Sequence, residues 1–249
     1  MSDFESTWMR EYATRQQGRP RPPTPEEIAE HGATADHHMD GWLPEDRSTP
    51  ILEVGCGSGW FLSALAARGF ANISGLDLSP SQVALARELG HEVHEAGALE
   101  FLAGRDSEFG LIVVMDVLEH LTRQQAWELL EYALKALRPG GRIIFQTPNG
   151  DSPWVGNVFY GDPTHITCYA PLLLEKIMLA AGFEQVEMRP SGPVPSGILK
   201  RIRYWAWRLV HGALALINRL EGAVWSGIQT RNFLCAGIRP DSPGRDTAE

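Results

Sequence analysis

The chain has 249 residues, 43% of them hydrophobic, and carries a net charge of −9 at pH 7. This size and composition suit one α/β domain with additions, and the acidic balance argues against nucleic acid as a partner. Three widely spaced cysteines exclude a disulfide framework, no uncharged apolar run is long enough for a membrane span, and the N-terminus lacks the layout of a signal peptide, so we expect a cytoplasmic protein.

The predicted elements begin with helices over 3–17 and 25–35, separated by a proline-broken loop over 18–25. We expect residues 1–45 to form an N-terminal helical cap. Strands then alternate with helices, which predicts a parallel, doubly wound sheet. The predicted strands lie near 51–54, 73–77, 92–95, 110–115 and 142–147, and the helices near 60–68, 80–89 and 122–137. A helix over 171–181, strands over 184–189 and 232–239, and a frayed tail over 241–249 complete the chain.

A glycine-rich turn joins the first strand to the helix that follows it. Gly55, Gly57 and Gly59 lie between an Ile-Leu-Glu-Val strand and a helical segment that begins at Trp60. Glycine lets the backbone turn sharply and approach a ligand closely. The free N–H groups at the start of the helix point toward the same place. The arrangement predicts a site for a small-molecule cofactor.

The stretch E-V-G-C-G-S-G over 53–59 resembles the first motif of class I S-adenosylmethionine (SAM)-dependent methyltransferases. The next predicted strand ends at Asp77, where an acidic residue can bind both ribose hydroxyls of the cofactor. In the third motif Ala98 replaces a common aspartate, so we expect backbone groups there to contact adenine. The resemblance implies a Rossmann-like sheet of seven strands, mostly parallel with an antiparallel last strand, within a domain over 46–240. It implies SAM as cofactor and S-adenosylhomocysteine as product, with these contact residues: Glu53, Gly55, Cys56, Gly57, Gly59, Asp77, Leu78, Ala98, Leu99 and Asp116.

Two further motifs supply candidate catalytic groups. The V-L-E-H-L stretch at the end of the fourth strand resembles the fourth motif of small-molecule methyltransferases and brings Glu119 and His120 to the substrate end. In the alternative interpretation, both residues only cap and orient the next helix. The D-P-T-H stretch ending at His165 resembles methyltransferases that act on glycans and quinone precursors. A loop histidine suits a general base, although it can equally be a structural, hydrogen-bonded residue.

We favour His165 as the base, with His120 as the second candidate. Asp116, Glu119, His120 and His165 could instead bind a divalent metal that acidifies the acceptor hydroxyl. Metal-dependent methyltransferases with E-x-x-E-H carry glutamate at the first of these positions. The shorter Asp116 here does not favour a metal.

A basic amphipathic segment, 198–228, is inserted before the last strand. Ile198, Ile202, Trp205, Leu209, Leu216 and Leu220 recur at helical spacing. Five basic residues gather on the opposite arc: Lys200, Arg201, Arg203, Arg208 and Arg219. Two interpretations of 198–220 have equal weight: a helix at a membrane surface, which would bring the protein to the inner face of the membrane, and a helix packed on the sheet or in a homodimer. The region near Trp225 could also form a lid over the acceptor.

Taken together, these patterns predict an O-methyltransferase that transfers the SAM methyl group to a sugar hydroxyl of a glycan or lipid-linked saccharide precursor. Alternatives are a quinone precursor or a soluble secondary metabolite as acceptor, and a non-catalytic SAM-binding subunit. A nicotinamide-dependent oxidoreductase is a third class, disfavoured because its fingerprint requires G-x-G-x-x-G.

Overall fold

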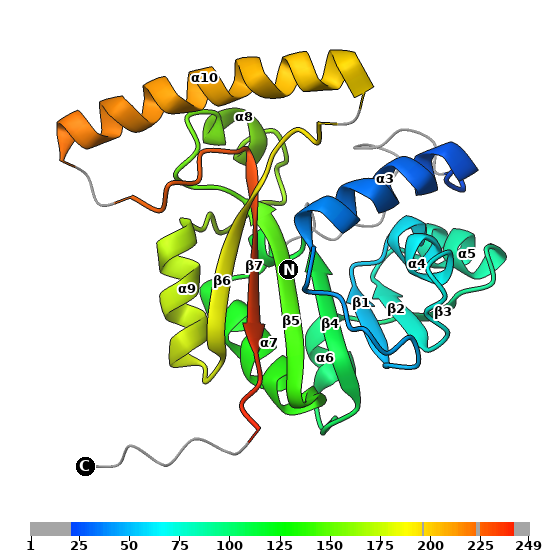
Figure 1. The fold of residues 1–249 in the computed structure, drawn as a ribbon. Coiled ribbons are helices and arrows are strands. Elements are labelled where there is room, and N and C mark those ends of the chain that lie inside the picture. The colour runs from blue at the N-terminus through cyan, green and yellow to red at the C-terminus, as the bar shows by residue number, and fades with distance from the viewer. Residues whose placement is uncertain (1–20, 196, 223–224, 242–249) are drawn as a thin grey trace, which may run out of the picture.

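A computed structural model describes residues 21–195, 197–222 and 225–241 (Figure 1). The helix predicted over 3–17 and the tail over 242–249 lie outside these residues. Within them, one sheet of seven strands has the order β3-β2-β1-β4-β5-β7-β6. The strands are β1 (Ile51–Val54), β2 (Ile73–Asp77), β3 (Glu92–Glu95), β4 (Phe109–Met115), β5 (Leu137–Pro148), β6 (Glu184–Ser191) and β7 (Asn232–Ile238).

The strand directions confirm the predicted sheet. β1 pairs in parallel with both β2 and β4, β2 pairs in parallel with β3, and β4 with β5. β7 runs antiparallel to β5 and β6. Because β1, β2 and β4 are in parallel register, their carboxyl ends meet at one edge of the sheet, which is where open α/β sheets bind ligands.

Helices cover both faces of the sheet, and residues that alternate along its strands point to two cores. The helices are α3 (Pro25–His38), α4 (Trp60–Ala66), α5 (Pro80–Glu88), α6 (Ala98–Leu102), α7 (Arg123–Ala136), α8 (Val155–Phe159), α9 (Pro171–Ala180) and α10 (Gly197–Glu221). Leu52, Ile112 and Phe145 pack with α6, α7 and α9. Ile51, Val113 and other residues of the opposite face pack with α3 and α4. Burial on both faces explains why the central strand β4 reads as a continuous apolar run.

The predicted helices differ from the structure mainly at short elements. Three were not predicted: α6, α8 and a 3₁₀ helix over Leu118–His120. The helix expected over 25–35 is present as α3 and runs on to His38. It begins with a capping box, in which the Thr24 hydroxyl accepts from the Glu27 N–H and the Glu27 carboxylate accepts from the Thr24 N–H.

The carboxyl edge of the sheet lies beneath α3, α8 and α10 in Figure 1. α10 crosses this end of the molecule above α8 and extends beyond the sheet. Among the described helices, none combines the length and the low polarity needed to cross a bilayer.

Candidate functional site

The glycine turn after β1 has a backbone that only glycine adopts easily. Gly55, Gly57 and Gly59 have φ values of 74°, 52° and 80°, which lie in the left-handed region. A Cβ on Gly55 would lie 2.4 Å from Cγ2 of Val117, so this glycine also lets the turn pack against the end of β4. A Cβ on Gly57 would meet nothing within 4 Å. The middle of the turn is therefore an open cradle, as the predicted SAM site requires.

Asp77 ends β2 beside this cradle. Its Oδ2 accepts a hydrogen bond from the Gly57 N–H at 2.9 Å, and its Oδ1 accepts one from the Ser79 N–H at 2.8 Å. Burial raises the pKa of Asp77, and the bonds from Ser79 and Gly57 oppose the rise. Each carboxylate oxygen has a second acceptor position. The side chain is thus fixed in place and can still accept from a pair of hydroxyls.

Two predicted cofactor residues of the turn are buried behind it. Glu53 is 1% exposed and its Oε2 has no hydrogen-bond partner. Burial, and next the Asp77 carboxylate, raise the pKa of Glu53 well above its usual value, against a hydrogen bond from the Leu62 backbone. The Cys56 side chain is buried against Gly75. Cys56 can therefore contribute only backbone atoms to the cradle, and a direct cofactor contact by Glu53 stays a prediction.

The predicted adenine contacts lie near the ends of β2 and β3. Leu78 follows Asp77 and is 62% exposed, an unusual position for a large apolar side chain. Its Cδ2 lies next to Gly97, where a Cβ would be 3.8 Å away. Ala98 and Leu99 open α6, so their N–H groups are among those that a helix leaves without an internal partner. The structure thus combines an exposed apolar surface with free backbone donors.

Asp116 follows β4 in a left-handed conformation, with φ of 53°. Its Oδ2 accepts from Nε2 of Gln146 at 2.8 Å, and its Oδ1 accepts from Nδ2 of Asn232 at 3.1 Å. Surrounding protein raises the pKa of Asp116, although the residue keeps contact with solvent, and the Gln146 bond opposes the rise. Aspartate tolerates the left-handed region better than most residues. The two amides therefore hold a carboxylate at the open end of β4.

Glu119 lies deeper, at 1% exposure, and links β4 to the loop that carries His165. Its Oε2 accepts from Oγ1 of Thr147 at 3.1 Å. Its backbone oxygen accepts from the N–H groups of Ile166 and Thr167, at 2.7 and 3.1 Å. Burial, and next the Asp116 carboxylate, raise the pKa of Glu119 well above its usual value. Glu119 is therefore more than the cap of the helix that follows it.

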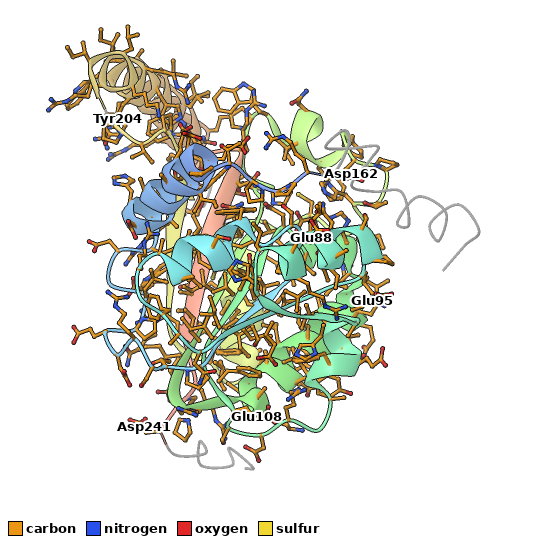
Figure 2. All side chains as sticks on the ribbon, turned by 90° about the vertical axis from the view of Figure 1, so that its right-hand side faces the viewer. Glu88, Glu95, Glu108, Asp162, Tyr204 and Asp241 are labelled. Atoms are coloured by element: carbon orange, nitrogen blue, oxygen red, sulfur yellow. The ribbon has the colours of Figure 1, made fainter. Side chains whose placement is uncertain are left out.

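Both candidate bases are held through Nδ1. Nδ1 of His165 lies 2.9 Å from the Phe159 carbonyl oxygen, so it carries the proton and Nε2 keeps a lone pair. Nδ1 of His120 lies 2.9 Å from Oγ1 of Thr164, whose own proton goes to Oδ1 of Asp162 at 2.6 Å. This network likewise assigns the proton of His120 to Nδ1. Figure 2 shows the labelled Asp162 at this end of the molecule.

His120 and His165 both lie close to the Glu119 carboxyl group. Nε2 of His165 lies 3.9 Å from Oε1 of Glu119, and the two imidazole rings have centroids 4.8 Å apart. Burial lowers the pKa of His120, and a charge on His165 would lower it further. A neutral imidazole whose proton is on Nδ1 accepts a second proton at Nε2. The loop histidine is therefore brought to the end of β4, as a catalytic role requires.

The structure brings together some of the residues predicted as an alternative metal site. One ligand atom each from Glu119, His120 and His165 falls within 4.8 Å of the other two. Asp116 is not part of this group, and its two oxygens already accept from Gln146 and Asn232. Hydrogen bonds that fix Nδ1 are typical of histidine ligands, but they orient a general base equally well. Three of the four predicted groups are therefore suitable as metal ligands.

Sequence reasoning missed the residues that support these groups, namely Gln146, Thr147, Asn232 and the Phe159 carbonyl. Thr147 is fully buried and gave no signal beyond strand propensity. Asn232 reaches Asp116 only because β7 pairs with β5, with Asn232 opposite Pro148. A polar residue at the first position of the last predicted strand was the one available hint.

Comparisons with known proteins agree on the kind of protein. The sequence profile of the methyltransferase domain family matches residues 28–188. A ubiquinone biosynthesis O-methyltransferase of Idiomarina loihiensis is 33% identical over 120 residues, which are 46% of this chain and 46% of that protein. The chain thus spans less than half the length of this curated relative.

Solved structures share the fold at low sequence identity. A SAM-dependent methyltransferase from Archaeoglobus fulgidus has a TM-score of 0.65 and 19% identity, with 91% of this chain and 97% of that chain covered. A phosphoethanolamine N-methyltransferase of Haemonchus contortus, solved with SAM, has a TM-score of 0.62 and 18% identity, with 93% and 60% covered. At such identities the likeness extends to the fold alone.

Proposed function

This chain belongs to the class I SAM-dependent methyltransferases, and from that premise we propose that it methylates an aromatic hydroxyl group of a quinone precursor. The observation that carries the proposal is the similarity to ubiquinone biosynthesis O-methyltransferases. It favours the alternative acceptor of the sequence analysis over the saccharide. We therefore replace the saccharide acceptor with a phenolic one.

Carboxyl groups are concentrated in and beneath the proposed site. Asp77 ends β2, Asp116 and Glu119 follow β4, Glu53 is buried in β1, and Asp162 lies on the loop that carries His165. When bound, SAM supplies an electrophilic methyl group on a positively charged sulfur. The open cradle at Gly57 would receive the methionine end, and Asp77 the ribose hydroxyls. A cationic cofactor suits this surplus of carboxylates.

His165 is the proposed base. A phenolic hydroxyl has a pKa of about 10, so an imidazole can accept its proton as the new oxygen–carbon bond forms. Nε2 of His165 would take that proton, because Nδ1 already donates to the Phe159 carbonyl. The imidazolium would then lie 3.9 Å from Oε1 of Glu119, and the Glu119 carboxyl would stabilise that charge once it gives up its own proton. A sugar hydroxyl is a much weaker acid than a phenol, so an imidazole would remove its proton less readily.

The test is direct methyl transfer in vitro. The purified chain is supplied with SAM carrying a labelled methyl group and a prenylated catechol, an unprenylated catechol or a saccharide panel, and the products are separated by mass. We expect the label on a catechol oxygen. Label confined to saccharides, or to a nitrogen or carbon of any acceptor, would contradict the proposal. Asp77→Ala serves as the control, because it should abolish transfer at low SAM concentration to every acceptor.

A further inference from the structure

One side of α10 is fastened to the body of the protein. Tyr204, Trp207, His211 and Asn218 recur at intervals of three, four and seven and are partly buried. A Cβ on Gly192 would lie 2.9 Å from the Trp207 ring, and the rings of His211 and Trp154 stack at 6.4 Å. Near the start of the helix, Lys200 pairs with Glu30 of α3 at 2.7 Å. The orientation of α10 about its own axis is therefore fixed.

The opposite side of α10 is apolar and exposed. At 100° per residue its large side chains fall within an arc of about 60°, directed away from Trp207. They are Ile198, Ile202, Trp205, Leu209, Leu216 and Leu220, and each is between 58% and 79% exposed. No other described residue covers them, and α10 has no buried residue at all. In Figure 2 this helix is viewed almost along its axis. It stands clear of the sheet, and side chains project outward from it. A contiguous apolar strip of this kind marks an interaction surface.

Arginines border the strip. Arg201, Arg208 and Arg219 fall within about 20° of one another on one flank. On the other flank the exposed apolar residues Leu199, Val210 and Ile217 come before Arg203. Within residues 197–221 the single acidic residue is Glu221, against five basic ones. The whole chain, by contrast, carries a charge of −9. Basic charge is therefore concentrated beside the exposed apolar strip.

From this arrangement we infer that α10 docks in the plane of an anionic lipid bilayer, with the apolar strip in the acyl boundary and the arginines among the headgroups. An aliphatic face with a tryptophan, bordered by arginines, has the chemistry of an interfacial helix. A second copy of this chain is a poorer occupant. Two identical strips packed face to face in antiparallel orientation would bring the arginine rows together, and Glu221 is the one acidic residue of α10 to offset them.

The docked helix would sit next to the proposed catalytic loop. Trp154 stacks on His211 and directly precedes α8, and Phe159 at the end of α8 accepts from His165. On the proposed function, which this step assumes, α10 would hold the acceptor site at the membrane surface, where a prenylated substrate resides. The docking itself needs no assumption about the reaction.

Vesicle flotation with the full chain tests the docking at low ionic strength. The vesicles contain either phosphatidylcholine alone or phosphatidylcholine mixed with phosphatidylglycerol. We expect binding to the mixed vesicles to exceed binding to the neutral ones by at least about tenfold. The triple variant Arg201→Ser, Arg208→Ser, Arg219→Ser should lose roughly a hundredfold, since each basic residue near an anionic surface contributes about fivefold. Leu209→Asp should abolish binding.

Matched control variants distinguish a specific role of the α10 strip from the effect of changing charge anywhere on the surface. Arg123→Ser, Arg138→Ser and Lys176→Ser together remove the same charge from exposed positions elsewhere, and Leu179→Asp places an acid on an exposed leucine of α9. Both controls should bind as wild type does. Equal binding to neutral and anionic vesicles, or losses in the controls that match those in α10, would overturn the inference. So would a lipid-free dimer that Leu209→Asp converts to a monomer, because a second copy would then cover the strip.

The two proposals can fail independently. Flotation requires no turnover, so vesicle binding remains measurable if no catechol is methylated. Methylation of a soluble catechol by Leu209→Asp should equal that of wild type, because Leu209 faces away from the site. Loss of that activity together with vesicle binding would indicate that Leu209 supports folding, and an unchanged thermal midpoint checks this point.

Discussion

Replacing Glu119 with glutamine removes a buried ionisable group and leaves an oxygen that still accepts from Thr147. Glu119 is 1% exposed, and burial together with the Asp116 carboxylate raises its pKa well above the usual value. Thr147, at 3.1 Å, opposes the rise only in part. We therefore expect Glu119→Gln to make the protein more stable at neutral pH and to reduce its turnover. Active sites often keep a group that lowers stability because activity requires it.

The magnitude follows from proton linkage. Between the ordinary pKa of a glutamate and the raised pKa of Glu119, the folded protein holds one proton more than the unfolded chain. The free energy of unfolding of the wild type therefore falls by up to about 1.4 kcal/mol for each pH unit across that window. Glutamine takes no part in this exchange. The advantage of the variant should be absent below the ordinary glutamate pKa, grow with pH across the window and level off above the raised pKa.

Urea unfolding at several pH values between 4 and 8 measures this difference, with both proteins first freed of metal by a chelator. Glu131→Gln, an exposed change on α7, is the control and should follow the wild type at every pH. A stability difference that stays flat from pH 5 to 8, or that shrinks as pH rises, would refute the reasoning. It would mean that His165 or another partner compensates the buried carboxylate.

Three further predictions concern the cofactor and the base. Asp77→Ala should weaken SAM binding by at least about tenfold in calorimetry, because it removes a charged, doubly accepting contact, and unchanged affinity would reject the ribose assignment. His165→Ala should lower kcat by about 10²- to 10⁴-fold without changing SAM affinity, with a smaller loss for His120→Ala; wild-type turnover would remove His165 as the base. Turnover should be unchanged after treatment with a chelator. If the chelator abolishes turnover and added Mg²⁺ or Mn²⁺ restores it, Glu119, His120 and His165 are metal ligands instead.

The local parts of the site were predictable because they are encoded within short stretches of chain. The glycine turn, Asp77 and the start of the helix after it depend on backbone conformations that neighbouring residues impose. The alternation of strands and helices follows from hydrophobic period, and it predicted strand boundaries within two residues of those observed, except that β5 begins at Leu137 and not at 142. The short helices α6 and α8 were not predicted, because five residues are too few to show a helical period.

Contacts between distant segments were decided only by the tertiary structure. His165 reaches Glu119 because two backbone N–H groups of its loop bond to the Glu119 carbonyl, and Asn232 reaches Asp116 through the β5–β7 register. Neither arrangement leaves a trace in local sequence. For α10 the two levels divide. The helical period in the sequence already places its apolar residues on one face. Whether the face packs inward or stays exposed depends on which side the rest of the fold holds, and Trp207 and His211 hold the other side.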